Sequence, residues 1–350
     1  MRNHVTFAVP GSLDIPTGGY LYDKFMVDGL RKLGWSVNVL DVGTGFPRPG
    51  QHERQRALEV LKADESRAPI VVDGLALGTL PEAARQLAAC RPLIGLVHHP
   101  LFLETGHSSD VRQELFESEK AALSHCCRVI TTSRETQIRV AREFDYCADR
   151  ISTIEPGIIR PEKIACYRDA AHVDILSVGT LVPRKGHDQL INSLASLRNY
   201  SWKLRIVGSM DLDPGYTQKL RELISTLHLQ ERVVLYGNIS DAELSELFQT
   251  SDLFALASEY EGYGIAYAEA ILHGLPVVGT TGGAIKDTVP PGTGILVAPG
   301  DQDGLRTALK ELISNPERRR ALAECARRSG SHFQTWETAA SRFASVFEDV

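Results

Sequence analysis

The chain has 350 residues, of which 43% are hydrophobic and 23% charged, a composition typical of a globular protein with room for two domains. Its formal net charge of -6 argues against general nucleic-acid binding, for which a basic surface is expected. No apolar run approaches about 18 residues, and the first residues enter a strand directly, so we expect no signal peptide, no membrane span and a cytoplasmic location. Local basic patches leave room for peripheral contact with a membrane surface.

The N-terminal half alternates strand patterns with helix patterns. We expect strands at Val5–Val9, Ser36–Leu40, Pro69–Asp73, Leu93–Val97, Arg128–Thr132 and Ile151–Ile154. Helices are expected between them at Tyr20–Leu33, Glu82–Ala89, Ser109–Leu123 and Arg134–Phe144. Such alternation predicts a parallel sheet with helices on both faces.

Pro156-Gly157 begins a largely polar stretch, so residues 158–172 are expected to link two domains. A second series of strands follows, expected at Val173–Val178, Lys203–Val207, Val233–Tyr236, Asp252–Leu256, Pro276–Val278 and Ile295–Val297. The final segment, Trp336–Glu348, is predicted to be a helix with Ala339, Phe343 and Val346 on one face. We therefore predict an α/β protein with two doubly wound domains, residues 1–157 and 173–330, that face each other across a cleft.

Six cysteines are scattered along the chain without a C-x-x-C pair: Cys90, Cys126, Cys127, Cys147, Cys166 and Cys325. We expect buried or unreactive thiols in a reducing compartment. Zinc binding by Cys126 and Cys127 with His125 is rejected, because adjacent residues do not easily face the same metal.

Two glutamates, Glu261 and Glu269, stand eight positions apart just after the strand Asp252–Leu256. The stretch Ile265–Leu272 is predicted to be a helix that ends at Gly274. Glu261 then lies in a loop and Glu269 in a helix. Eight helical residues span about 12 Å at roughly 1.5 Å per residue, which argues against joint acid/base work on one glycosidic oxygen. The spacing suits two parts of one extended, hydroxyl-rich ligand.

The segment Glu261–Ala270 resembles the E-x7-E motif of retaining glycosyltransferases of family 4, which have the GT-B fold of two Rossmann-like domains. The resemblance extends over roughly Val173 to Asp301, with the elements in the family order, through Ser177–His187, Leu204–Ser209, Gly237–Leu247, Thr280–Gly283 and Gly294–Asp301. It implies that the terminal helix, residues 331–350, returns to the N-terminal domain.

The family binds a nucleotide sugar whose diphosphate is the leaving group. Gly179 ends a strand, and Arg184 and Lys185 lie in the loop before the next helix. Two cations and free N–H groups at a helix start suit a pyrophosphate, although isolated surface cations are usually only solvated. Most of the family has an arginine where this chain has Thr180, so one phosphate contact is missing and Arg184 is the candidate substitute.

By the same resemblance, Glu269 accepts hydrogen bonds from the ribose 2′ and 3′ hydroxyls, and Glu261 contacts the donor sugar. A carboxylate is well suited to accept from two neighbouring hydroxyls. The glycines beside them let the backbone approach the donor, unless they are ordinary loop glycines. The expected donor-binding set is completed by Gly208, Gly262, Tyr263, Gly264, Gly282 and Gly283.

In the N-terminal half, Gly18-Gly19 opens a helix as the acceptor-side loop of the family does, with a structural turn as the alternative. His98 matches a histidine that reaches the donor sugar, at its C6 hydroxyl. The alternative for His98 and its neighbour is a pair of buried, hydrogen-bonded histidines. The acceptor-side candidates are Gly18, Gly19, His99, Glu104 and His107.

Together these features predict a retaining glycosyltransferase that needs no cofactor and no metal. It would move a hexose from a UDP- or GDP-sugar to a hydroxyl of a small molecule, glycan or lipid. The catalytic candidates are Lys185, Arg184, His98 and Glu261, with the leaving phosphate helping to deprotonate the acceptor. We interpret Asp211-Leu212-Asp213 as a loop rather than a metal-binding D-x-D motif.

Other functions are also weighed. A GT-B epimerase needs further acid/base residues, and a phosphorylase needs a lysine for pyridoxal phosphate; neither signature is visible. A catalytically silent subunit that binds a sugar nucleotide or polysaccharide is favoured by one feature, Thr180.

Overall fold

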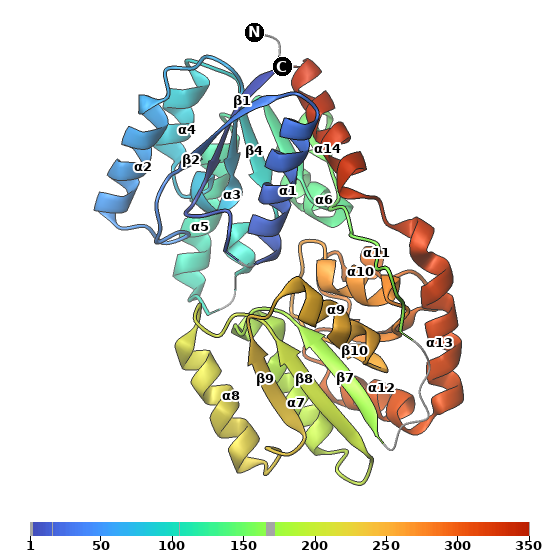
Figure 1. Cartoon of the computed structure of the whole chain (residues 1–350). Coiled ribbons are helices and arrows are strands. Elements are labelled where there is room, and N and C mark those ends of the chain that lie inside the picture. Colours follow the sequence, from blue (N-terminus) through green and yellow to red (C-terminus); the bar gives the residue numbers. More distant parts are fainter. Residues whose placement is uncertain (1–2, 16, 105, 166–171, 350) are drawn as a thin grey trace. The chain divides into compact units, whose positions relative to one another are not determined.

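The computed structural model describes residues 3–15, 17–104, 106–165 and 172–349. It divides the chain into two compact units (Figure 1). The first comprises Met1–Gly157 with Gln334–Val350, and the second comprises Ile158–Phe333. Part of the expected linker, including Cys166, lies outside the described residues.

The first unit is built on a six-stranded parallel sheet in the order β2-β1-β3-β4-β5-β6. All of its ladders are parallel, so the carboxyl ends of its strands lie at one edge. The strands are β1 His4–Val9, β2 Ser36–Asp41, β3 Ile70–Asp73, β4 Leu93–Val97, β5 Arg128–Thr131 and β6 Ile151–Thr153.

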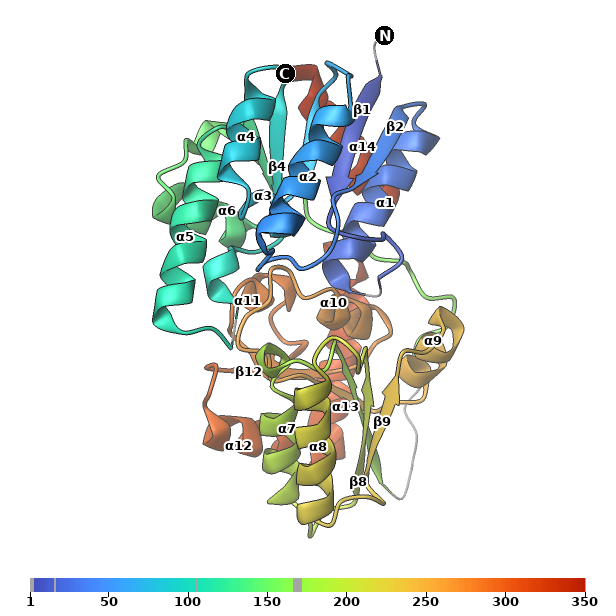
Figure 2. The same cartoon turned by 90° about the vertical axis from the view of Figure 1, so that its left-hand side faces the viewer.

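Side chains of the central strands alternate between two cores, one on each face of this sheet. Val5 and Phe7 point into one core with Tyr22, whereas Ala8 and Ile70 point into the other. Figures 1 and 2 show α2 and α4 on one face and α1 and α14 on the other. The helices are α1 Gly18–Lys32, α2 Gln51–Ala63, α3 Gly74–Leu77, α4 Pro81–Ala88, α5 Ser109–Leu123, α6 Arg134–Glu143 and α14 Trp336–Ser345, with 3-10 turns at Leu101–Leu103, Ala148–Arg150 and Val346–Asp349.

Helix α14, near the end of the chain, belongs to the core of the first unit. Trp336 stacks on Phe25 of α1 with ring centroids 4.2 Å apart. Gly29 of α1 faces Ala340 so closely that an added Cβ would lie 2.4 Å from the Ala340 Cβ. The terminal segment is thus held by close packing against α1 as well as by hydrophobic burial.

The second unit is also a six-stranded parallel sheet, in the order β12-β11-β10-β7-β8-β9. Its strands are β7 Val173–Val178, β8 Trp202–Val207, β9 Val233–Gly237, β10 Leu253–Ala255, β11 Val277–Thr280 and β12 Gly294–Val297. Its helices are α7 His187–Ala195, α8 Pro214–Thr226, α9 Asp241–Gln249, α10 Ile265–Leu272, α11 Ile285–Thr288, α12 Gln302–Ser314 and α13 Pro316–Arg328, with 3-10 turns at Pro183–Lys185 and Ser329–His332.

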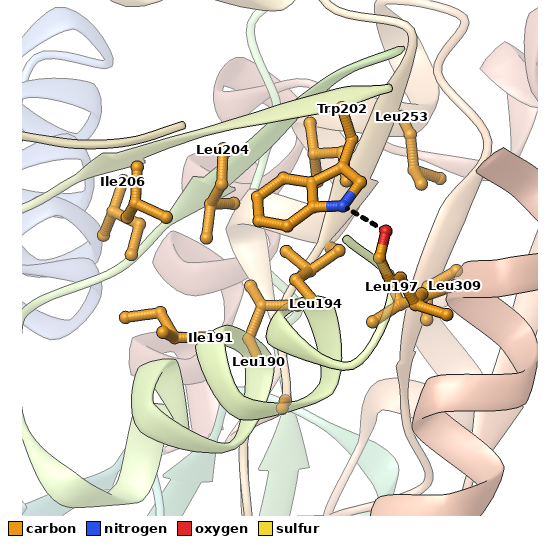
Figure 3. Close-up of a cluster of buried hydrophobic side chains, with 14 of the residues drawn as sticks. Leu190, Ile191, Leu194, Leu197, Trp202, Leu204, Ile206, Leu253 and Leu309 are labelled. Atoms are coloured by element: carbon orange, nitrogen blue, oxygen red, sulfur yellow. Dashed lines mark hydrogen bonds between the residues drawn. The ribbon is translucent and has the colours of Figure 1, made fainter. Parts of the chain in front are cut away.

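Trp202 lies at the centre of one core of this unit. Its ring is buried among leucines and isoleucines of β8, β10, α7 and α12, and its Nε1–H donates to Leu197 O at 3.0 Å (Figure 3). The buried polar atom therefore has a partner, as the dry interior requires. The opposite face of the sheet is covered by a second core that includes Phe248 of α9 and Tyr267 of α10.

The structure confirms the predicted α/β class with two doubly wound parallel sheets. Most expected elements agree with the observed ones within three residues, and β4, α5, β7 and α10 agree at both ends. Helices α2, α8, α12 and α13 were not predicted; in α2 only Ala57 and Leu61 are buried, so its apolar stripe is weak. None of the helices within the described ranges is long and apolar enough to cross a membrane.

Candidate active site

The strand order of the second unit reverses between β7 and β10. The chain runs from β7 outward to β8 and β9, then returns to the other side of β7 with β10, β11 and β12. In open parallel sheets, ligands bind beyond the carboxyl ends of the strands at such a point. The loops after β7 and β10, residues 179–186 and 256–264, therefore form the candidate donor site.

The loop after β7 is tied to the neighbouring strand. The N–H groups of Gly179 and Leu181 donate to Val207 O and Ser209 O at 2.8 and 2.9 Å. At Gly208, where φ is 152°, an added Cβ would lie 2.1 Å from the Gly179 carbonyl oxygen. Only glycine permits this approach. The predicted donor-site glycines Gly179 and Gly208 are therefore in direct backbone contact.

Thr180 follows Gly179 and is partly exposed. Behind this turn, the buried His187 places Nε2 3.2 Å from Gly179 O. Burial lowers the pKa of His187 to about 4, so the ring is neutral and its Nε2–H can donate to that carbonyl. His187 thereby holds the turn, a role that the sequence pattern did not reveal.

Lys185 and Glu261, which are 76 positions apart in sequence, form the centre of the donor site. Lys185 Nζ lies 2.6 Å from Glu261 Oε1. The same oxygen accepts a hydrogen bond from Ser258 Oγ, also at 2.6 Å. Ser258 was not among the predicted residues; its position three residues before Glu261, in the loop after β10, is the only signal in the sequence.

The charge of Glu261 is stabilised although its side chain is only 10% exposed. Burial opposes ionisation, but the cations Lys185 and Arg184, with the hydrogen bonds from Lys185 and Ser258, hold the pKa of Glu261 below its usual range. Arg184 donates from Nη1 to Tyr260 O at 2.7 Å, and the same nitrogen lies 3.9 Å from Glu261 Oε2. The predicted phosphate-binding cations thus lie directly against the predicted sugar-binding carboxylate.

Glu269 has a different environment. It lies on α10 and is partly exposed, and burial, with a smaller contribution from Asp241, raises its pKa to about 7. Within the described residues, its carboxylate has no hydrogen-bond partner, whereas the Glu261 carboxylate has two. Glu269 is therefore the acidic group that is ready to accept new hydrogen bonds.

The remaining predicted donor residues surround the Glu261 loop. Gly283 forms a bridge with Glu261 and has a φ of 67°; a Cβ there would lie 2.2 Å from Glu261 O. Gly282 packs equally closely on the backbone of the same loop. Gly262 lies in this loop, and Gly264 begins α10 with a left-handed φ of 96°. Tyr263 is only 8% exposed and packs in a hydrophobic core.

A second cluster lies in the first unit, at the point where its strand order reverses between β1 and β3. His98, just after β4, places Nε2 3.1 Å from Asp23 Oδ1 of α1 and 3.1 Å from Asp73 Oδ2 of β3. The two carboxylates raise the pKa of His98 to about 10 although burial opposes this. The sequence analysis identified His98 but neither aspartate, because the pairing joins residues 75 and 25 positions apart.

The acceptor-side candidates lie near this cluster or follow it in sequence. Gly19 packs on His98, since a Cβ at Gly19 would lie 3.4 Å from the ring. Gly18 opens α1 beside it. His99 Nε2 lies 2.5 Å from Glu104 Oε1, whereas His107 is partly exposed in the loop before α5. Both His98 and His99 are hydrogen-bonded and mostly buried, which is the alternative stated for them, and their contact with a substrate stays a prediction.

Among the described residues, only Asp23, Asp73 and His98 bring three metal-type ligand atoms within 4.8 Å of one another. A proton on His98 Nε2 can donate to these two carboxylates, so the cluster is accounted for without a metal ion. Asp213 accepts from Tyr216 N at 2.8 Å as the cap of α8, which agrees with our interpretation of its segment as a loop. The cysteines in the described ranges have free thiols.

Two doubly wound parallel domains with a nucleotide-type site at a switch point define the GT-B class of glycosyltransferases. Comparison of solved structures supports this. Sucrose-phosphate synthase from Thermosynechococcus elongatus superposes with a TM-score of 0.86 at 20% identity, over 99% of each chain. WaaG, a glycosyltransferase involved in lipopolysaccharide biosynthesis, superposes with a TM-score of 0.75 at 18% identity, over 98% of this chain and 99% of that chain.

Sequence comparison leads to the family. Residues 169–329 match the family described as Glycosyl transferases group 1. The MMP alpha-(1->4)-mannosyltransferase of Mycolicibacterium hassiacum is 26% identical over 93% of this chain and 82% of its own. The GDP-mannose-dependent alpha-(1-6)-phosphatidylinositol monomannoside mannosyltransferase of Mycolicibacterium smegmatis is 29% identical over 75% of this chain and 74% of its own. The chain is thus similar to family 4 glycosyltransferases with the GT-B fold, and the family match itself covers residues 169–329, which supports the resemblance noted in the sequence.

Proposed function

We propose that this glycosyltransferase transfers a hexose, with retention of configuration, from a nucleoside-diphosphate sugar bound at the β7/β10 switch point, and that GDP-mannose is the first donor to test. This choice of donor is supported by similarity to two mannosyltransferases, one of which is named as GDP-mannose-dependent. The acceptor is a hydroxyl of a small molecule, glycan or lipid. The observation that carries the donor site is the Lys185–Glu261 pair at 2.6 Å.

The diphosphate is held by Lys185 and Arg184. With Glu261 ionised, Arg184, Lys185 and Glu261 carry a net charge of +1 in the loops after β7 and β10, where each side chain is at most 16% exposed. A buried, fixed positive charge favours the extra negative charge that develops on the leaving phosphate. Because this stabilisation comes from side chains, we propose that no divalent ion is needed; chelation by EDTA should leave turnover unchanged.

Glu261 is proposed to orient the sugar rather than to attack it. Its Oε1 already accepts from Lys185 and Ser258, and its pKa is lowered, so it is a weak nucleophile and a weak base. This supports a front-face reaction in which the leaving phosphate oxygen takes the acceptor proton. Glu269, without a protein partner for its carboxylate, is proposed to accept from the two ribose hydroxyls.

The test combines binding with turnover. A thermal-shift screen of GDP-, UDP- and ADP-sugars should show the largest rise in Tm with the true donor, because ligand binds the folded state. The best donor is then assayed for hydrolysis without an acceptor. Lys185→Ala should abolish most of that hydrolysis, whereas Lys203→Ala, at an exposed position of β8 in the same unit, should not.

A silent subunit is the competing function, favoured by Thr180 in place of the arginine of the family. It predicts that a sugar nucleotide raises Tm while neither hydrolysis nor transfer is seen with any donor. The silent-subunit function would be excluded if the wild-type protein turns over a donor and Lys185→Ala does not.

A further inference from the structure

We propose that Asp23 and Asp73 keep the His98 ring doubly protonated, so that the first unit presents a permanent hydrogen-bond donor, Nδ1–H, to a hydroxyl oxygen of a substrate. In this view His98 does not act as a base, and the two aspartates are positioning residues. The inference rests on the proposed transferase function for the identity of the substrate. The protonation state itself can be measured without any reaction.

The geometry brings three elements to one nitrogen. Asp23 from α1 and Asp73 from the end of β3 each place one carboxylate oxygen 3.1 Å from Nε2 of His98, just after β4. The exposed fractions of the three side chains are 1% for Asp23, 6% for Asp73 and 18% for His98. Water therefore has little access to the contact between the two carboxylates and His98 Nε2.

Two carboxylates around one nitrogen determine which ring atoms carry protons. An ionised carboxylate can only accept a hydrogen bond, so a lone pair on Nε2 would face two acceptors and be repelled. Nε2 therefore carries a proton. The two negative charges then favour a second proton on the same ring, and it can only sit on Nδ1. Nδ1 makes no hydrogen bond within the described part of the chain, and it is not among the fully buried polar atoms without a partner. It is therefore the ring atom that a ligand can reach.

The other groups that face the ring leave this charge balance intact. Tyr22 of α1 packs its ring against His98 with centroids 5.4 Å apart, and Tyr20 OH donates to Pro10 O. Burial raises the pKa of both tyrosines, so they stay neutral. Thr132 and Thr136, before and on α6, donate to the backbone carbonyl of His98 rather than to its ring.

The order of titration also supports the proposal. The pKa of His98 is raised to about 10, whereas burial raises that of Asp23 to about 7. As the pH falls through 7, the next proton therefore goes to Asp23, whose Oδ2 is buried without a hydrogen-bond partner within the described residues. As the pH rises above 7, Asp23 becomes ionised and the ring stays charged up to about pH 9.

The first experiment measures the ring itself. In protein labelled with ¹⁵N-histidine, the His98 signal, assigned by its loss in His98→Gln, should show two protonated ring nitrogens up to about pH 9. A titration near the ordinary histidine pKa of about 6.5 would overturn the proposal. So would a metal-bound ring signal that changes when EDTA is added. Neither result depends on finding a donor or acceptor.

The second experiment uses Asp23→Asn in the full chain, with Asp28→Asn as control because Asp28 lies on the same helix with a half-exposed side chain. Loss of one carboxylate lowers the pKa of His98. The hydrogen bond to Asp73 keeps the proton on His98 Nε2, so the proton that the ring loses is the one on Nδ1. The kcat/KM of the variant should therefore fall roughly tenfold per pH unit above the new pKa, while wild type and Asp28→Asn stay flat between about pH 7.5 and 9.

Binding of free GDP separates this proposal from the donor-site proposal. Because the nucleotide site lies in the second unit, GDP affinity in Asp23→Asn should stay unchanged. A flat pH profile in a folded Asp23→Asn would refute the role of Asp23, even if Lys185→Ala behaves as expected. If Asp23→Asn does not fold, Asp73→Asn provides the same comparison, with Asp23 retaining the Nε2 proton.

Discussion

Donor binding should depend on pH through Glu269. The carboxyl has a pKa of about 7 in the ligand-free protein, against an ordinary value of 4.5. Two ribose hydroxyls would donate to the ionised form and stabilise it, so the donor binds the carboxylate in preference to the acid. Affinity is then full above about pH 7 and is lost as the pH falls, because a proton must leave before the ribose can bind.

The magnitude follows from the two pKa values. If ribose returns the pKa to 4.5, affinity at pH 5.5 should be about thirtyfold weaker than at pH 8, and binding at pH 7 should release about half a proton. The intact sugar nucleotide is the proper ligand, because the terminal phosphate of a free nucleoside diphosphate itself titrates near pH 6. Calorimetry in two buffers of different ionisation enthalpy measures both quantities.

Two variants decide whether Glu269 is the cause. Glu269→Gln should flatten the dependence between pH 5.5 and 8 and release no proton at pH 7. Glu246→Gln, at an exposed position of α9 in the same unit, should behave as wild type. Constant affinity in the wild-type protein, or the same slope in Glu269→Gln, would refute the assignment of Glu269 to the ribose.

Three further predictions concern other residues. Lys185→Ala should lower kcat/KM by about 10²–10³, as expected for loss of one group that stabilises the leaving oxyanion, whereas Lys203→Ala should not; near-normal turnover would remove Lys185 from the phosphate site. Glu261→Gln should weaken the intact donor more than the free nucleoside diphosphate, which lacks the sugar, and equal losses for both ligands by calorimetry would contradict this division. Gly29→Val should destabilise the first unit by about 1–3 kcal/mol in thermal or urea unfolding, because its Cβ would overlap Ala340 at 2.4 Å; an unchanged midpoint would mean that α14 shifts without cost.

Local patterns were sufficient for most of the elements. The mainly apolar segments Val173–Val178 and Leu93–Val97 predict strands that agree with β7 and β4 at both ends, because strands buried on both faces consist mostly of apolar residues. Helix α2 escaped prediction since it buries few residues. Local patterns do not say which strands are neighbours, and the pairing of β7 with β10 is what creates the switch point.

The site divides in the same way. The order of glycines, cations and glutamates from Gly179 to Glu269 was readable along the chain, and it was enough to show the resemblance to the family. The Lys185–Glu261 pair, the neutral state of His187 and the opposite pKa shifts of Glu261 and Glu269 were not readable, because each depends on burial and on partners brought close by folding.

The sequence by itself determined the alternation of strands and helices, the two-domain α/β class and the residue types available for phosphate and hydroxyl recognition. Tertiary structure alone decided their state: which carboxylate already has partners, and which imidazole carries a charge. Asp23 and Asp73 illustrate the reason. Nothing in their local sequence marks them, yet both lie 3.1 Å from His98 Nε2 once β3, β4 and α1 converge at one edge of the sheet. Electrostatic interactions depend on distance in space and on burial, and neither follows from separation along the chain.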